Sequence, residues 1–394
     1  MCRCALRILV LTSSYPRYPG DGSPAFVRDL ATFYADEAEV MVLTPSLPGM
    51  GSTDIDESVQ IRRFRYAPRK VETLADGAMA EILRESKLQY LAAVSFVLCE
   101  AVAIRRAIRS FNPDVVHAHW VLPQGLAVVL SGVKTPTLLT THGGDLYGFR
   151  GKVLEALKRQ ILKRMGRITV VNSEMAEIVR GWGLSADDVL VEPMGADVIG
   201  LGRSGETGDD GRARTGVVAV GRLVEKKGFH VLMDALKLMP EPPNVTIVGE
   251  GPERARLEEL SDGLPVRFTG QLPRNEVGRI LAGAAMVVVP SVEAASGDKD
   301  GLPVAMLEAM SLGVPVISSD LPGLSDVAVD GLTGLIVPPG DSKALAGALD
   351  ALLGDADRCS RLGAEAAAVA EHYSSRAVGG RYLELLESLA ADRH

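Results

Sequence analysis

The chain has 394 residues, of which 47% are hydrophobic and 23% are charged. This length exceeds one ordinary hydrophobic core, and this composition excludes a disordered or fibrous chain. The net charge is −8 at pH 7, and most of the acidic excess lies in the second half, which argues against a general nucleic-acid-binding surface. The four cysteines are scattered, which suits a reducing compartment. Cys2 and Cys4 have no second pair of Cys or His residues to complete a zinc site, so we expect no zinc centre.

The N-terminal segment and the longest apolar segment both argue for a cytoplasmic protein. The strand-like run at 7–13 ends at a Tyr-Pro turn and does not resemble a signal peptide. The apolar segment 90–111 is interrupted by Glu100 and by arginines before it reaches spanning length, so we expect a buried helix. The segments 61–70 and 152–167 are basic, which leaves peripheral contact with the inner face of a membrane as an alternative to ordinary surface helices.

Short apolar runs alternate with helical patterns along the chain, which is typical of an α/β fold with parallel sheets covered by helices. The glycine-rich stretch 200–216 predicts a linker. We expect a Rossmann-like domain at 1–199, a second at 217–374, and a last helix at 375–394 that belongs to either one. The expected strands are 7–13, 38–45, 114–119, 136–142 and 167–173, then 217–222, 244–250, 266–270, 285–291 and 314–320.

Ligands bind at the carboxyl ends of the strands in open α/β sheets, so two such domains facing one another predict a site in the cleft between them. After the first strand, Gly20 and Gly22 precede a helix expected at 24–35. Glycine permits close backbone approach and the helix start offers free N–H groups, so this loop either accepts an anion or is a simple turn.

Two histidine motifs follow strands of the first domain. His117 and His119 lie on one side of their strand, and their spacing would suit zinc, but no third ligand is near in sequence, which favours a structural or pocket-lining role. In HGGD, His142 and Asp145 flank two glycines at a strand end. This placement favours a functional role over a buried capping histidine.

In the second domain, Arg222 and Lys227 lie around a glycine-flanked loop after a strand. A planar guanidinium fork and a point charge at this spacing predict a clamp for a diphosphate. The alternative is a solvated charged loop, which fits Glu225 and Lys226 better. No strand is followed by a complete dinucleotide fingerprint, so a nicotinamide dehydrogenase is disfavoured.

The segment DKDGLPVAMLEAM, 298–310, places an acidic triplet before a short helix. Asp300 lies just upstream of the helix start, and Val304 and Ala305 supply N–H groups there, as a phosphate would require. Glu308 lies inside the apolar part of the helix. A buried carboxylate is costly without hydrogen bonds, and sugar hydroxyls would supply them.

These motifs together resemble the retaining GT-B glycosyltransferases of family 4, the glycosyltransferase group 1 type. The resemblance runs in order along almost the whole chain. It is carried by PGDGSPAFV, DVVHAHWVLPQG, THGGD, ITVVNSE, MGAD, VGRLVEKKG, VTIVGEGP, DGLPVAMLEAMSLGVPVISSDLPG and DGLTGLIVPPGD.

The resemblance implies that the second domain binds a UDP- or GDP-linked hexose and that the first binds most of a glycan, lipid-linked or small-molecule acceptor. It assigns catalytic roles to His142, to Asp300 at the donor sugar ring and to Glu308 at the ribose hydroxyls. It implies transfer without a metal or other cofactor. The implied donor-binding residues are Gly20, Gly22, Asp145, Arg222, Lys227, Leu272, Gly301, Leu302, Val304 and Ala305.

This sequence departs from the family pattern at two positions. Asp300 stands where the family usually has glutamate, and Glu293 is an alternative for the same role. Pro303 replaces a glycine found in many members and removes one N–H. A nucleotide-sugar isomerase or epimerase of the same architecture is the alternative function. The motifs leave the donor sugar, the base, the acceptor and the oligomeric state open.

Overall fold

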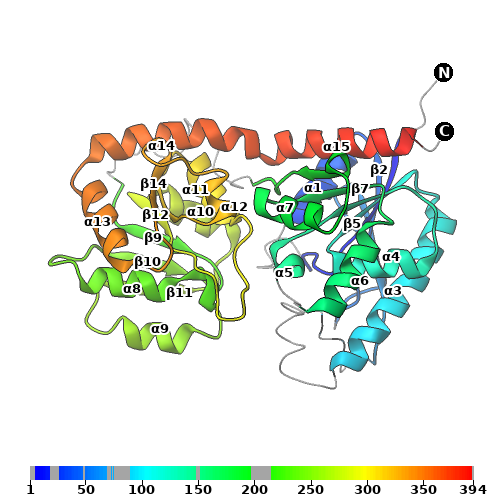
Figure 1. Cartoon of the computed structure of the whole chain (residues 1–394), viewed down its shortest axis with the longest axis horizontal. Helices are drawn as coiled ribbons and strands as arrows, with labels where there is room; N and C mark the ends of the chain where they lie inside the picture. Colours follow the sequence, from blue (N-terminus) through cyan, green and yellow to red (C-terminus); the bar gives the residue numbers. More distant parts are fainter. Residues whose placement is uncertain are drawn as a thin grey trace. The chain divides into compact units, whose positions relative to one another are not determined.

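The computed structural model describes residues 5–17, 26–47, 49–68, 72, 74, 89–147, 151–196 and 214–392. The chain divides into two compact units (Figure 1). The first unit comprises residues 1–193 and 378–394, and the second comprises 194–377. Most of the linker predicted at 200–216 lies outside the described residues.

The first unit is built on an eight-stranded sheet with the order β3-β4-β2-β1-β5-β6-β7-β8. All neighbours pair in parallel except β3 and β4, which form an antiparallel hairpin at one edge. The strands are β1 Arg7–Leu11, β2 Glu39–Pro45, β3 Thr53–Asp56, β4 Val59–Phe64, β5 Val115–His119, β6 Thr137–Thr140, β7 Arg167–Val170 and β8 Val189–Val191. The central strands β5 and β6 are fully buried, and β1 is buried from Ile8 onward, as expected when helices cover both faces.

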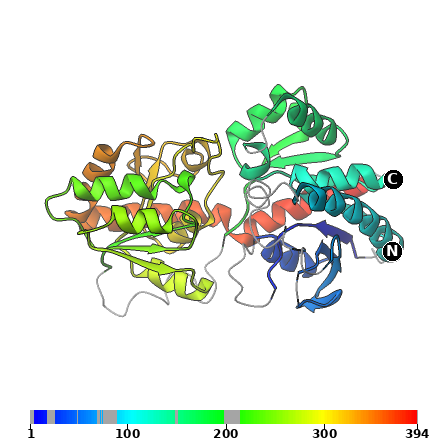
Figure 2. The ribbon, with the colours of Figure 1, turned by 90° about the horizontal axis from the view of Figure 1, so that it is seen from below.

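The helices of this unit are α1 Phe26–Ala35, α3 Gln89–Phe111, α4 Leu126–Ser131, α5 Gly143–Leu146, α6 Lys152–Leu162, α7 Ser173–Gly181 and α15 Ser375–Ala391. Side chains of α3 and α4 share one apolar cluster with β1, β2 and β5. Those of α5, α6 and α7 share another with β6 and β7. Figure 2 shows these helices from a second direction.

The second unit has a six-stranded parallel sheet with the order β11-β10-β9-β12-β13-β14. Its strands are β9 Val217–Val220, β10 Val245–Val248, β11 Val266–Gly270, β12 Met286–Val289, β13 Val316–Ser319 and β14 Gly334–Val337. Its helices are α8 Phe229–Lys237, α9 Arg254–Leu260, α10 Arg274–Ala282, α11 Val304–Ser311, α12 Pro322–Ser325, α13 Ser342–Leu353 and α14 Ala356–Ala370.

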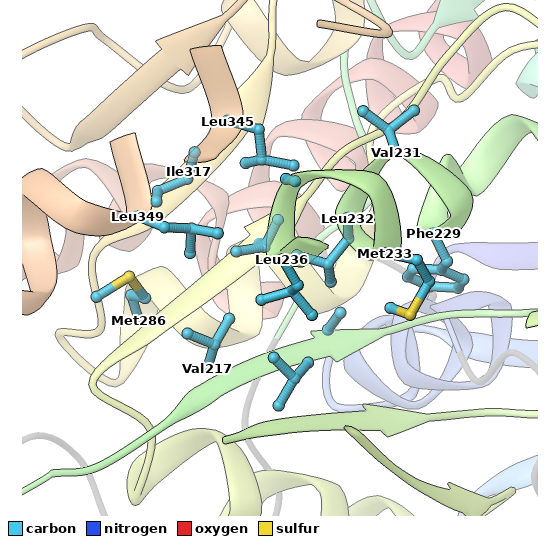
Figure 3. Close-up of a cluster of buried hydrophobic side chains, with 14 of the residues drawn as sticks. Val217, Phe229, Val231, Leu232, Met233, Leu236, Met286, Ile317, Leu345 and Leu349 are labelled. Atoms are coloured by element: carbon cyan, nitrogen blue, oxygen red, sulfur yellow. The ribbon is translucent and has the colours of Figure 1, made fainter. Parts of the chain in front are cut away.

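Alternate residues of each strand in this sheet enter two different cores. Val217 and Met286 pack with α8, α9 and α13, in the cluster of Figure 3. Val218 and Val287, one position further along, pack with α10, α11, α12 and α14. This period of two is the reason that the strands read as continuous apolar runs. Figure 1 shows α8 and α9 on one side of this sheet and α10 and α11 on the other.

All ten expected strands are present, with ends that differ by a few residues. Four strands were not expected: β3 and β4, the three-residue β8, and the glycine-led β14. The helix expected at 24–35 is described from Phe26 onward as α1, and residues 18–25 lie outside the described part of the chain.

The expectation that segment 90–111 is a buried helix is wrong for one face of α3. Four apolar side chains on that face are exposed, from 43% at Val102 to 72% at Leu91, with Val94 and Leu98 between them. Their spacing of three or four residues forms a continuous stripe. The opposite face, which includes Phe96 and Ile104, is fully buried. No helix among the described residues is long and apolar enough to span a bilayer.

The last helix, α15, returns to the first unit after the second unit is complete. The Arg381 guanidinium donates to both carboxylate oxygens of Glu192, at 2.9 and 2.8 Å. The Tyr382 hydroxyl, fully buried, donates to the Glu192 carbonyl oxygen at 2.8 Å. These bonds attach α15 to the segment just after β8.

Candidate active site

In the second unit, the loop after β9 is held against the end of β12 by backbone packing. Gly228 ends this loop with φ 64°, and a Cβ there would lie 1.8 Å from the Pro290 carbonyl oxygen. Only glycine allows this approach. The Val292 N–H donates to the Lys226 carbonyl oxygen at 2.9 Å and joins the same two segments. Lys226 and Lys227, in the loop after β9, are thereby brought close to the acidic segment that follows β12.

Lys227 and Asp300 form a buried ion pair at this junction. The Lys227 Nζ lies 2.9 Å from Asp300 Oδ2, and Asp300 is only 7% exposed. The Ser291 hydroxyl donates to the same oxygen at 2.6 Å, and the Lys226 Nζ lies 4.0 Å from Oδ1. Burial alone would raise the pKa of this carboxyl, but the two lysines and the hydroxyl bring it below its ordinary value. Asp300 is therefore an anion at neutral pH.

The loop bearing Arg222 is held just as closely to the end of β10. A Cβ on Gly249 would lie 2.0 Å from the Gly221 carbonyl oxygen, and one on Gly251 would lie 2.4 Å from that of Leu223. The glycines of VGEG thus serve backbone packing between two loops. Arg222 is fixed on both sides by this packing, while the residue itself is exposed.

Glu225 is exposed, as the alternative of a solvated loop requires, whereas Lys226 is half-buried, and both contact the acidic segment. The Lys226 Nζ lies 3.1 Å from Asp298 Oδ2, and Glu225 accepts the Ala295 N–H at 3.1 Å. Both residues hold the acidic segment in place. No group of three or more His, Cys, Asp or Glu side chains is placed to hold a metal within the described ranges.

Glu308 is buried inside α11 and is paired with an arginine that the sequence did not indicate. The Arg274 Nε donates to Glu308 Oε1 at 3.1 Å, and Glu308 is 8% exposed. Arg274 is the first residue of α10, 34 positions earlier, so no local pattern could have linked the two. This pairing keeps a carboxylate in an apolar helix.

The remaining predicted donor residues of the second unit lie at the start of α11, just before it, or just before α10. Val304 and Ala305 are the first two residues of α11, whose N–H groups have no partner inside the helix. Gly301 and Leu302 precede them and are half-buried. Leu272, also half-buried, lies two positions before Arg274. Glu293, the alternative to Asp300, is exposed.

In the first unit, His142 follows β6 and contacts His119 at the end of β5. The His119 Nδ1 and His142 Nε2 are 3.3 Å apart, and the two rings stack with centroids 5.5 Å apart and planes 19° apart. Phe26 and Trp120 pack on His142, with centroids at 5.1 and 4.7 Å. Burial lowers the pKa of His142 to about 3, so this imidazole is neutral at pH 7.

Asp145 is buried directly behind His142. Its Oδ1 accepts the His142 N–H at 2.9 Å and its Oδ2 accepts the Val121 N–H at 2.6 Å. Burial raises its pKa to about 7, against the effect of these two bonds. In this arrangement Asp145 positions His142 by joining the chain after β6 to the chain after β5.

His117 belongs to a buried polar network. It contacts the Tyr34 hydroxyl at 3.1 Å and the Thr140 hydroxyl at 2.7 Å. Its ring also stacks on Tyr382 of α15, with centroids 5.3 Å apart. On the other side it lies 4.2 Å from the ring of His119. A row of four rings in contact therefore runs from Tyr382 of α15 through His117 and His119 to His142.

Sequence reasoning did not single out Ser291 and Arg274, and it did not predict the contact between His119 and His142. Ser291 follows a buried strand, which is a signal for the carboxyl edge of a sheet. Arg274 and the histidine contact depend on pairing between distant segments. Gly20 and Gly22 lie outside the described residues.

Family models match both units. A model described as glycosyl transferases group 1 matches residues 214–355, and one described as a glycosyl transferase 4-like domain matches residues 21–195. AmsK of Erwinia amylovora, an amylovoran biosynthesis glycosyltransferase by name, is 30% identical over 300 residues, which are 72% of each chain. TuaC of Bacillus subtilis, named for teichuronic acid biosynthesis, is 31% identical over 253 residues. That match spans 61% of this chain and 61% of TuaC, less than two thirds of that relative.

Solved structures resemble almost the whole chain. Sucrose-phosphate synthase of Thermosynechococcus elongatus has a TM-score of 0.77 at 21% identity, covering 98% of this chain and 100% of that chain. HepE of Anabaena, solved in complex with UDP-glucose, has a TM-score of 0.71 at 18% identity, covering 97% and 100%. At these identities the likeness concerns the fold.

Proposed function

Because this chain belongs to the group 1 glycosyltransferases and has their GT-B fold, we propose that it transfers a hexose-type sugar with retention from a UDP- or GDP-linked donor to a hydroxyl acceptor. The observation that carries the proposal is the buried pair of Lys227 and Asp300 beside the start of α11. This pair places the Lys227 cation and the ionised Asp300 carboxylate at the carboxyl edge of one sheet, just before the N–H groups at the start of α11.

In this proposal the second unit binds the donor. Arg222 and Lys227 contact the diphosphate, and the N–H groups at the start of α11 add to them. Glu308, oriented by Arg274, accepts hydrogen bonds from the ribose hydroxyls, and Leu272 lies by the base. Gly301 and Leu302 complete the wall beside the sugar. The complex of HepE with UDP-glucose supports a donor of this class.

Transfer breaks the bond between the anomeric carbon and the diphosphate oxygen and forms a bond from that carbon to the acceptor oxygen on the same face. The acceptor proton passes to a phosphate oxygen of the leaving group, so no protein base is required. Negative charge on the leaving diphosphate is stabilised by Arg222 and Lys227. Asp300 offsets positive charge at the anomeric carbon, and the neutral His142 hydrogen-bonds the transferred sugar. Neither step uses a metal or other cofactor.

The acceptor is assigned to the first unit, and its class is a glycan, a lipid-linked saccharide or a small-molecule hydroxyl compound. AmsK and TuaC, named for the biosynthesis of amylovoran and teichuronic acid, support a role in polysaccharide or glycoconjugate biosynthesis. The alternative of an isomerase or epimerase is not favoured, because these relatives are named glycosyltransferases.

We place the protein in the cytoplasm with peripheral contact at the inner membrane face. The surface that supports this contact is the exposed stripe of α3, not α6, whose Leu157 and Ile161 pack into the core. The exposed charged residues of α3 are Arg105, Arg106 and Arg109, which suits an anionic bilayer. Co-sedimentation with vesicles containing anionic lipid tests this: binding should weaken in Leu91→Ser/Leu98→Ser, and no binding at low salt contradicts it.

The proposed reaction is tested by incubating the enzyme with UDP- and GDP-hexoses and a panel of saccharide and lipid-linked acceptors. Release of nucleoside diphosphate together with a glycosylated product is expected. NMR of the product should show the anomeric configuration of the donor. Conversion of the donor to its epimer without an acceptor, or an inverted product, contradicts the proposal. Inclusion of EDTA should leave the rate unchanged.

A further inference from the structure

Arg63 is a buried arginine that has no partner among the described residues. The residue is 6% exposed, and none of its three guanidinium nitrogens has a hydrogen-bond partner within the described part of the chain. A buried charge that lacks a counter-charge costs several kcal/mol, so buried arginines are ordinarily paired. Burial accordingly lowers the pKa of Arg63. An uncompensated guanidinium in a well-formed sheet is a feature that packing does not explain.

The neighbouring carboxylates do not neutralise Arg63 because they bind other groups. Asp56 is held by the Arg28 fork, at 2.5 and 2.9 Å, and by the Tyr15 hydroxyl at 3.2 Å. Asp54 and Tyr15 act on Arg63 only through longer-range attraction. Asp54 Oδ1 accepts the Ile55 N–H at 2.9 Å. Arg28 and Arg63 therefore differ: the Arg28 guanidinium is bonded to a carboxylate of the protein, whereas the Arg63 guanidinium has no such bond among the described residues.

The position of Arg63 in the sheet suits a ligand site. It is the second-last residue of β4 and lies in register with Thr44 near the end of β2. This is the carboxyl edge of the sheet, where α/β proteins bind ligands. Phe64, on the opposite face, packs against Phe96 of α3. By strand alternation Arg63 faces away from α3.

From these contacts we infer that Arg63 binds an oxyanion, a phosphate or a carboxylate, carried by the acceptor. A guanidinium presents parallel N–H groups that match either anion in two-point contact. The assignment to the acceptor rests on the proposed function, since the first unit is assigned to that substrate. The anion site itself rests only on Arg63 and its surroundings.

The direct test is NMR of the protein with 15N-labelled arginine, using Arg63→Met to identify the Arg63 Nε–Hε signal. Inorganic phosphate and sodium glucuronate are titrated separately against sodium chloride of equal ionic strength. We expect a saturable shift of the Arg63 signal with one of the two anions. The anion that causes the shift shows whether the group bound by Arg63 is a phosphate or a carboxylate. The paired Arg28 signal should not move. If neither anion moves the Arg63 signal, or if both arginine signals move alike, the inference is overturned.

Thermal unfolding separates a binding role from a structural one. Arg63→Met should keep or raise the Tm without added anion, because it removes an unpaired buried charge. Arg28→Met, which leaves Asp56 without its fork, should lower it. A larger loss of Tm in Arg63→Met than in Arg28→Met would make Arg63 structural and overturn the inference.

UDP or GDP affinity measured by calorimetry should be equal in Arg63→Met and wild type; a weakened nucleotide affinity would refute the assignment to the acceptor. Absence of nucleotide binding in both would contradict the proposed function and leave the anion result to stand on its own.

Discussion

Lys227 and Asp300 are joined by a 2.9 Å ion pair that connects the loop after β9 to the segment before α11. The cation proposed for the diphosphate and the anion proposed for the sugar ring are therefore one unit. Each holds the other in position before any donor arrives. This prior arrangement lowers the cost of ordering the site when the donor binds.

Breaking this pair from either side should be costly, and removing both partners should cost less than the sum. Lys227→Met leaves a buried carboxylate whose remaining partners among the described residues are Ser291 and Lys226, and a loss of about 3 kcal/mol is expected. Asp300→Asn leaves the Lys227 ammonium without the carboxylate that it pairs with. A double-mutant cycle on thermal unfolding measures the coupling. Additive losses in Lys227→Met/Asp300→Asn would show that the two residues act independently.

Arg274 should act on the nucleotide through Glu308. Arg274→Ala leaves Glu308 buried without its bonded cation, so its orientation toward the ribose is lost. We expect the donor KM to rise about tenfold, ~1.4 kcal/mol of binding, with a smaller change in kcat. Arg256→Ala on the surface of α9, where the side chain is 59% exposed, is the matched control. A change confined to kcat would contradict a role in nucleotide binding.

Gly228 should be irreplaceable, whereas another glycine with a similar backbone should not. Gly228→Ala places a Cβ 1.8 Å from the Pro290 carbonyl oxygen at φ 64°. Gly331→Ala has φ 70° but no atom within 4 Å of its Cβ, so it carries the backbone strain alone, about 1 kcal/mol. We expect Gly228→Ala to lower the Tm far more and to weaken nucleotide binding. Equal effects of the two substitutions would show that the loop packing is unimportant.

The buried histidines should make the protein sensitive to acid. The pKa of His117 and of His142 is lowered to about 3 by burial, below the unfolded value of about 6.5. The stability they contribute is complete above about pH 6.5 and is lost as the pH falls below it. Asp145 has the opposite sign: its pKa, raised to about 7, gives stability that is lost as the pH rises from about 4 to about 7.

Burial also lowers the pKa of His119 and raises that of Glu100 to about 8, so three histidines oppose two acids. The Tm should therefore fall between pH 7 and pH 5, and the fall should be steeper in Asp145→Asn, which lacks one of the two opposing contributions. Differential scanning fluorimetry across this range measures both slopes. A Tm that is constant or rises on acidification in the wild type would contradict neutral buried histidines.

Local patterns predicted the ten strands because fully buried strands are continuous apolar runs that any parallel sheet requires. They missed β8, which has three residues, β14, which begins with a glycine, the polar β3, and β4, whose two arginines break the apolar pattern. Asp300 and Glu308 could be singled out because a carboxylate beside or inside an apolar helix is unusual in any sequence. Their partners Lys227, Ser291 and Arg274 could not be assigned, because each pairing joins segments separated by 9 to 73 positions.

Calorimetric titration of the protein with UDP and with GDP tests the proposed donor site most directly. Wild type should bind at least one of the two, and Arg222→Ala should weaken that binding about tenfold or more, ~1.4 kcal/mol, while Arg358→Ala on α14 should not change it. Failure of both nucleotides to bind, or equal affinity in wild type and Arg222→Ala, would contradict a nucleotide-sugar site in the second unit.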